Sequence, residues 1–260
     1  MSWKKYVIGG VLFFVIFMIS NVPVLSVVSL AKIVSPASFS QLKLYGASGT
    51  LWQGEFDRVD VSGKSFQAVS WDINLLNLLT LQVSADVTLR MQGQPFSANI
   101  NASPFGSIAL ENVKGSIGAQ QLVQLANIPA VRLDGEFVLN LETVTISDQT
   151  LTEAVGRIVW TGAETRFPQR VLLGDLAADM TTEDDGIVVK ISDAGGPLKM
   201  KADFLLDPEN NYRLKGSMMA REGQQSLLGR SLGMMGSMDG QGNVKLDLKG
   251  NLSQFGFLIK

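Results

Sequence analysis

The fold class of this chain is decided by one segment, Leu81-Gln82-Val83-Ser84-Ala85-Asp86-Val87-Thr88-Leu89-Arg90-Met91. Apolar and polar residues alternate strictly along it, so every second side chain would lie on one apolar face. A period of two residues is typical of a β-strand with one buried face, whereas a helix repeats about every 3.6 residues. Gly93-Gln94-Pro95 then predicts a turn, and the alternation returns in Phe96, Ala98 and Ile100. The segment therefore predicts the first strand of a long antiparallel hairpin.

The same alternation recurs along most of the chain. Further strands are predicted at Gln41–Tyr45, Gly46–Gly54, Phe56–Val61, Phe66–Ile73, Ile108–Ile117, Val131–Leu141, Val155–Trp160, Leu172–Met180, Ile187–Ile191, Leu198–Leu206, from Tyr212 onward and at Val244–Gly250. Two Leu-rich stretches, Ala119–Ala126 and Gln224–Met235, predict short helices. The 26 glycines fit a chain with frequent turns. We predict a mainly β fold, an extended and curved antiparallel sheet with two short helices.

The N-terminal part of the chain has a different character. Tyr6–Ala31 contains no charged residue, while Lys4 and Lys5 precede it. A helix needs about 20 apolar residues to cross a bilayer, and Tyr6–Leu25 supplies that length. Positive residues beside a span stay on the cytoplasmic side, so this stretch predicts a transmembrane helix with a cytoplasmic N-terminus. A cleaved signal peptide ending at Ser29-Leu30-Ala31 is the alternative, and it would also export the rest of the chain.

These observations predict the division of the chain. Residues 1–35 would form a short leader, the span and a linker, and residues 36–260 a β domain outside the cytoplasm. Two portions of this domain share an order of features, which predicts similar halves at about 40–141 and 142–250. The shared features are Trp71 and Trp160, Gly115-Ser116 and Gly216-Ser217, Gln120-Gln121 and Gln224-Gln225, and Asp134-Gly135 and Asp239-Gly240. Chance recurrence of Gly, Gln and Leu in a Gly-rich chain is the alternative.

Composition argues against catalysis and against binding of nucleic acid. The chain has no His and no Cys, which excludes His-based triads, His general bases, His or Cys metal ligands and disulfides. Its 22 basic and 24 acidic residues give a net charge of -2, without a polybasic tract. The densest acidic cluster, Glu183-Asp184-Asp185-Gly186, lacks the ligand spacing of a calcium loop. We predict no catalytic, cofactor-binding or metal-binding residue, no cofactor and no enzymatic activity.

Several short motifs carry a family resemblance. They are Gly46-x-x-Gly49-Thr50-Leu51-Trp52-x-Gly54, Val69-Ser70-Trp71-Asp72-Ile73, Gly156-Arg157-Ile158-Val159-Trp160, Leu173-Gly174-Asp175-Leu176 and Ser192-Asp193-Ala194-Gly195-Gly196-Pro197-Leu198. In this order, and at this chain length, they resemble protein N of the bacterial type II secretion system. The resemblance implies a Gram-negative inner-membrane protein with a periplasmic β domain, and no catalytic residue to carry over. It also implies partners among the other secretion components, in the inner-membrane platform or at the outer-membrane secretin.

These observations leave two functions open. The first is a non-catalytic assembly component of the secretion system, tethered to the inner membrane. The second is a hydrophobic-groove protein that binds lipid, because anchored β arrays of this kind also resemble AsmA-like proteins. The apolar face of the sheet discriminates between them, since an open face favours lipid and a closed, packed face favours a scaffold.

Overall fold

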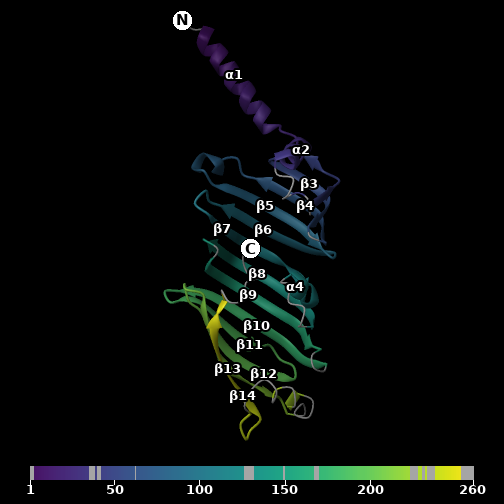
Figure 1. The fold of residues 1–260 in the computed structure, drawn as a ribbon, viewed down its shortest axis with the longest axis vertical. Helices are drawn as coiled ribbons and strands as arrows, with labels where there is room; N and C mark the ends of the chain where they lie inside the picture. The colour runs from purple at the N-terminus through teal and green to yellow at the C-terminus, as the bar shows by residue number, and fades with distance from the viewer. Residues whose placement is uncertain are drawn as a thin grey trace. The chain divides into compact units, whose positions relative to one another are not determined.

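The computed structural model describes residues 3–34, 39, 42–61, 63–125, 132–148, 150–166, 170–222, 228–229, 232 and 238–252. The chain divides into two compact units, Met1–Asn101 and Ala102–Lys260. Both are built from antiparallel strands that follow one another in chain order (Figure 1). The expected mainly β, antiparallel fold with few helices is confirmed.

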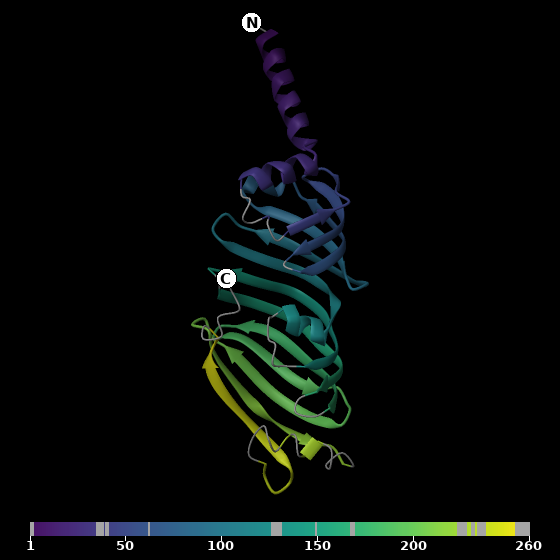
Figure 2. The same ribbon diagram turned by 45° about the vertical axis from the view of Figure 1, so that its right-hand side comes forward.

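The N-terminal unit holds two helices and an antiparallel set of strands. Its elements are α1 (Trp3–Ser20), α2 (Val24–Val34), β1 (Leu42–Tyr45), β2 (Ser48–Gly49), β3 (Gln53–Val61), β4 (Lys64–Ile73), the 3-10 helix η1 (Asn77–Thr80), β5 (Val83–Met91) and β6 (Gln94–Ala102). The strands lie in the order β1-β3-β4-β5-β6, with β2 beside β3. Figure 2 shows α2 lying across one end of these strands.

The hairpin predicted from the deciding segment is present as β5 and β6. Its turn lies at Gln92 and Gly93, one residue earlier than predicted, with φ angles of 50° and 87°. Two successive residues at positive φ give a tight turn whose twist matches that of the flanking strands. Pro95 is consequently the second residue of β6, near the strand end where a missing amide is tolerated.

The C-terminal unit is built mainly of long strands, with the short helix α4 between the first two. Its elements are β7 (Ser107–Gly118), α4 (Ala119–Leu125), β8 (Leu133–Ser147), β9 (Thr150–Thr165), β10 (Val171–Glu183), β11 (Gly186–Asp193), β12 (Leu198–Leu206), β13 (Asn211–Ala220) and β14 (Asn243–Asn251). They pair in sequence order from β7 to β14. The helix predicted at Ala119–Ala126 is confirmed as α4. Of the second predicted helix, only Leu228, Gly229 and Leu232 are described, and they are helical.

The predicted membrane-spanning stretch, Tyr6–Leu25, is not a single helix. α1 ends at Ser20, and the amide of Asn21 bonds to the Phe17 carbonyl, both through its backbone (3.2 Å) and through its side chain (2.8 Å). Pro23 lacks an amide hydrogen and restricts the residue before it, so the chain leaves the helix there and α2 starts anew at Val24. In the part of the chain that the structure describes, no helix has both the length and the apolar character that crossing a membrane requires.

Candidate interaction site: the apolar sheet faces

Strand register gathers the large apolar residues of the N-terminal unit on one face. Trp71 lies opposite Val87, and Val59 opposite Phe66. A β-bulge at Ala68, which has a φ of 47°, shifts the register between Gln67 and Ser70. The bulge compensates for the three-residue spacing of Phe66 and Val69, so that both still reach the same face. The opposite face is polar.

This apolar face of the N-terminal unit is only partly covered. Among the described residues of its strands, Ala98 alone is a buried hydrophobic residue. The other members of the face are half-buried, and they include Phe56, Phe66, Val69, Trp71, Ile73, Val87, Leu89, Met91, Phe96 and Ile100. A sheet face of this kind is incomplete without a further apolar layer.

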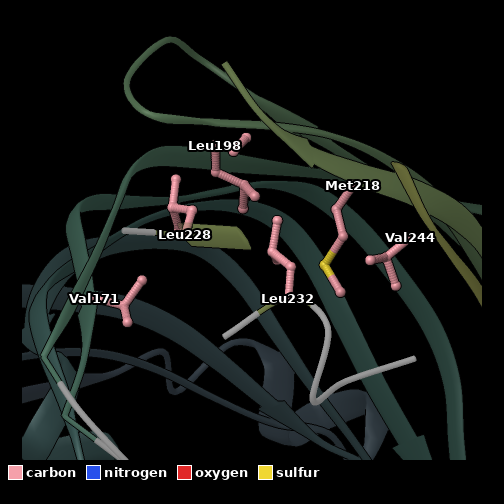
Figure 3. Close-up of a cluster of buried hydrophobic side chains, with 7 residues drawn as sticks. Val171, Leu198, Met218, Leu228, Leu232 and Val244 are labelled. Atoms are coloured by element: carbon pink, nitrogen blue, oxygen red, sulfur yellow. The ribbon is translucent and has the colours of Figure 1, made fainter. Parts of the chain in front are cut away.

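The C-terminal unit closes its apolar face with its own chain. Leu228 and Leu232, each 2% exposed, lie against the inner side chains of β12, β13 and β14. Figure 3 shows both leucines among the side chains of Val171, Leu198 and Met218, pointing toward one another. Val244 of β14 is completely buried in the same cluster. The face is therefore a packed core here, unlike the face of the N-terminal unit.

Two further groups complete the core of the C-terminal unit. α4 packs on β7 and β8 and buries Ala119 and Val123, and its first turn is capped where the Gly118 amide donates to Gln121 Oε1 (3.0 Å). Ala154, Ile187 and Leu206 form a second buried cluster. α4 therefore covers part of the face at β7 and β8, and the second cluster adds buried side chains from β9, β11 and β12.

The two strand–helix–strand segments of this unit share their register. Gly115 of β7 lies opposite Leu139 of β8, and Gly216 of β13 lies opposite Leu246 of β14. One position further, Lys114 faces Asn140 and Lys215 faces Asp247. In each segment a helical piece connects the paired strands and lies over the apolar face. This correspondence is what a duplicated unit would produce, and the division into similar halves stays a prediction.

Two arginines and two carboxylates of the C-terminal unit form an ion-pair network at the ends of β8, β9 and β10. Glu164 is buried, and its Oε1 accepts from Nε of Arg170 (2.8 Å), with Nε of Arg166 at 3.5 Å. Arg166 also pairs with Asp134. The hydrogen bond from Arg170 is the main cause that lowers the pKa of Glu164, against the opposing effect of burial. Both guanidinium groups are committed to carboxylates, which suits a structural role.

No constellation suited to metal chemistry stands out. Within the described ranges, no group of three or more carboxylates could hold a metal ion. The acidic cluster Glu183-Asp184-Asp185 is an exposed turn between β10 and β11. The prediction that the chain has no catalytic, cofactor-binding or metal-binding residues stays a prediction.

Two glycines of the motifs that resemble the family lie where another part of the chain comes very close to their backbone. A Cβ atom on Gly54 would lie 2.6 Å from the Ser48 carbonyl oxygen and 2.6 Å from the Trp71 ring. A Cβ on Gly174 would lie 2.9 Å from Cα of Gly196, where the β11–β12 connection crosses β10. The indole nitrogens of Trp71 and Trp160 donate to backbone carbonyls. These glycines and tryptophans therefore fix the sheet geometry.

Comparison with known proteins identifies the family. The family model described as type II secretion system (T2SS), protein N, matches residues 40–247. The type II secretion system protein N of Vibrio cholerae serotype O1 is 24% identical over 257 residues, which cover 96% of this chain and 100% of that protein. Its counterpart in Aeromonas hydrophila is 23% identical over 218 residues, covering 81% of this chain and 85% of that protein. No solved structure matches. Since the family model covers well over half of its length, this chain belongs to the protein N family of the type II secretion system.

Proposed function

We propose that this protein is a non-catalytic assembly component of the type II secretion system, tethered to the inner membrane and displaying its β domain to the periplasm. Residues 1–35 form the anchor and its linker, and residues 36–260 form the periplasmic domain. Family membership supports the secretion role. The main support for the membrane tether is the uncharged stretch Tyr6–Ala31, which follows Lys4 and Lys5 in the sequence.

The exposed side chains of α1 support the tether. Phe13, Phe14, Phe17, Met18 and Ile19 are all exposed large hydrophobic residues. A helix that presents phenylalanines to its surroundings without a protein layer over them needs an apolar medium. The inner membrane supplies that medium, and the lysines ahead of the stretch keep the N-terminus in the cytoplasm.

Cysteine accessibility tests this topology, because the natural chain has no Cys. Ser2→Cys and Gln94→Cys would each carry one reactive thiol, and Gln94 is exposed in β6. In cells with a permeabilised outer membrane, a membrane-impermeant maleimide should label Gln94→Cys, and it should label Ser2→Cys only after lysis. The protein should also stay in the membrane pellet after alkaline carbonate. Labelling of Ser2→Cys in unlysed cells, or release by carbonate, would contradict the tether.

The partners are proposed to be other secretion components, in the inner-membrane platform or at the outer-membrane secretin. Photo-crosslinking in cells from exposed positions would identify them. Leu172 in β10 and Met238 just before β14 are exposed apolar residues and suit this purpose. A secretion component captured from either position supports an assembly role, and the absence of any such component from both would count against it.

A lipid-binding role is the second candidate, and the partly covered face of the N-terminal unit favours it. Val87 lies on that face, and Thr88 lies on the opposite, polar face of the same strand. If the face holds lipid, mass spectrometry of the detergent-purified protein should find phospholipid on the wild type and on Thr88→Lys, and much less on Val87→Lys. A wild-type protein that is stable and free of lipid would remove this candidate. In the C-terminal unit Leu228 and Leu232 close the apolar face, so lipid binding is proposed for the N-terminal unit alone.

A further inference from the structure

The connection between β4 and β5 exposes a run of leucines. Leu76 is 74% exposed and Leu81 is 71% exposed, while Leu75 and Val83 on either side are also exposed. No charged residue occurs between Ile73 and Val83. A single exposed leucine is ordinary on a protein surface, but a contiguous uncharged group of them marks an interaction surface.

This leucine loop, residues 74–83, lies at the end of the N-terminal unit that joins the anchor. The backbone amide of Ile73 donates to the Trp52 carbonyl (2.6 Å), and the Trp52 indole donates to the Ile19 carbonyl at the end of α1 (2.7 Å). The Leu51 amide likewise donates to the Val22 carbonyl (2.8 Å). One residue, Trp52, thus connects the start of the loop to the last turn of α1.

α2 adds exposed apolar surface at the same end of the unit. α2 contacts β2 and its Val24 is buried, while Leu30, Ile33 and Val34 are exposed. Its one charged residue, Lys32, is also exposed and has a stem long enough to reach lipid headgroups. The anchor, α2 and the leucine loop therefore present apolar side chains from one end of the N-terminal unit.

Several backbone groups of the loop are hydrogen-bonded within the loop itself. The Leu76 amide donates to Asn74 Oδ1 (3.0 Å), the Leu81 amide to the Leu78 carbonyl (3.0 Å) and the Gln82 amide to the Asn77 carbonyl (3.1 Å). The Thr80 hydroxyl donates to the same Asn77 carbonyl (2.8 Å). Backbone groups that enter an apolar medium must be paired within the protein, and these bonds pair the amides of Leu76, Leu81 and Gln82 inside the turn.

We propose that the leucine loop inserts Leu75, Leu76 and Leu81 into the interface of the bilayer that holds α1. This rests on the proposed membrane tether. A bilayer fits better than a protein partner, because protein interfaces carry a polar rim, whereas this loop has no charged residue and is linked through Trp52 to the end of α1. The loop gives the β domain a second contact with the membrane, which fixes the orientation of the N-terminal unit about its anchor.

Site-specific fluorescence tests the insertion with the full chain. Single-cysteine variants Phe13→Cys in α1, Leu76→Cys in the loop and Gln94→Cys at the opposite end of β5 and β6 would each be labelled with an environment-sensitive NBD dye. The labelled proteins are reconstituted into vesicles of phosphatidylethanolamine and phosphatidylglycerol. Quenching by doxyl-labelled lipid reports lipid contact, and quenching by aqueous iodide reports exposure to water. Leu81→Cys repeats the loop measurement at a second exposed position.

The expected result is that the dyes at Phe13 and Leu76 lose fluorescence to doxyl lipid, whereas the dye at Gln94 loses it only to iodide. If Phe13 is quenched by lipid while Leu76 and Leu81 behave like Gln94, the insertion is wrong and the tether stands. If Phe13 itself is quenched only by iodide, the tether fails. Loop dyes shielded from both quenchers would mean that protein covers the leucines, and this would overturn the insertion.

Discussion

At the scale of single residues, the Asp193 carboxylate joins two distant parts of the C-terminal unit. Its Oδ2 accepts from the Met200 amide (3.0 Å), and Oδ1 pairs with Arg221, which lies 28 residues away. Burial alone would raise the pKa of Asp193, but the Met200 amide and the Arg221 guanidinium outweigh it and lower the pKa. The charged form is therefore favoured in the folded protein.

A carboxylate with a lowered folded pKa stabilises the protein above its unfolded pKa, which is about 3.9 for Asp. That stabilisation is lost as the pH falls toward the folded value. Asp193→Asn should therefore unfold at a lower temperature than wild type at pH 7. The difference between the two unfolding temperatures should become smaller as the pH is lowered toward about 3. Asp185→Asn, in the exposed β10–β11 turn, is the control and should unfold at the same temperature as wild type. Thermal unfolding across this pH range measures both, and a difference that widens in acid would contradict the assignment.

Gly54 illustrates how the motif glycines act. Any Cβ there would collide with the Ser48 carbonyl and with the Trp71 ring, as the distances above show. Gly54→Ala should lower the free energy of unfolding by about 1–3 kcal/mol, the usual range for overpacking. Gly240→Ala, where an added Cβ meets nothing within 4 Å, should change it by about 0.5 kcal/mol or less. Urea denaturation compares the two, and equal effects would mean that the contact with Trp71 is not what requires glycine.

At the scale of elements, the helical piece with Leu228 and Leu232 acts as the cover of the C-terminal sheet. Leu228→Ala removes a fully buried side chain and leaves a cavity, so it should lower the free energy of unfolding by about 2–5 kcal/mol. Leu122→Ala, at an exposed position of α4, is the control and should change it by about 0.5 kcal/mol or less. Chemical denaturation measures both. Similar small losses for both variants would show that the piece does not seal the core.

Much of the strand pattern could be predicted because it is local. Strict alternation predicted β5, β6 and β12, and the Leu-rich stretch before Pro129 predicted α4. β9 extends well beyond the predicted Val155–Trp160, because register shifts where it pairs with β8 interrupt its alternation. The pairing of Asp193 with Arg221 and the burial of Leu228 depend on which strands become neighbours. Such contacts between distant residues leave no periodic signal in the sequence.

At the scale of the whole molecule, the two units differ in how they bury apolar surface. The C-terminal unit contains both buried clusters, one around Leu228 and Val244 and the other around Ile187 and Leu206. In the sheet of the N-terminal unit, Ala98 is the sole buried hydrophobic residue among those described. Among the described residues, the helical pieces that pack on a sheet face and bury apolar side chains there, α4 and the piece with Leu228 and Leu232, belong to the C-terminal unit, and they account for the difference. No disulfide can compensate, because the chain has no Cys.

This difference predicts uneven local stability. Opening a strand exposes the apolar surface that it buries, so strands over a packed core open with a higher free energy than strands with a half-exposed face. Hydrogen exchange of the full-length protein in detergent, followed by mass spectrometry, should therefore show slower exchange in β10, β12 and β13 than in β3, β4 and β5. Leu228→Ala should accelerate exchange in the first group and leave the second unchanged. Equal protection of the two groups in the wild type would mean that the face of the N-terminal unit is covered in solution, by detergent, lipid or protein.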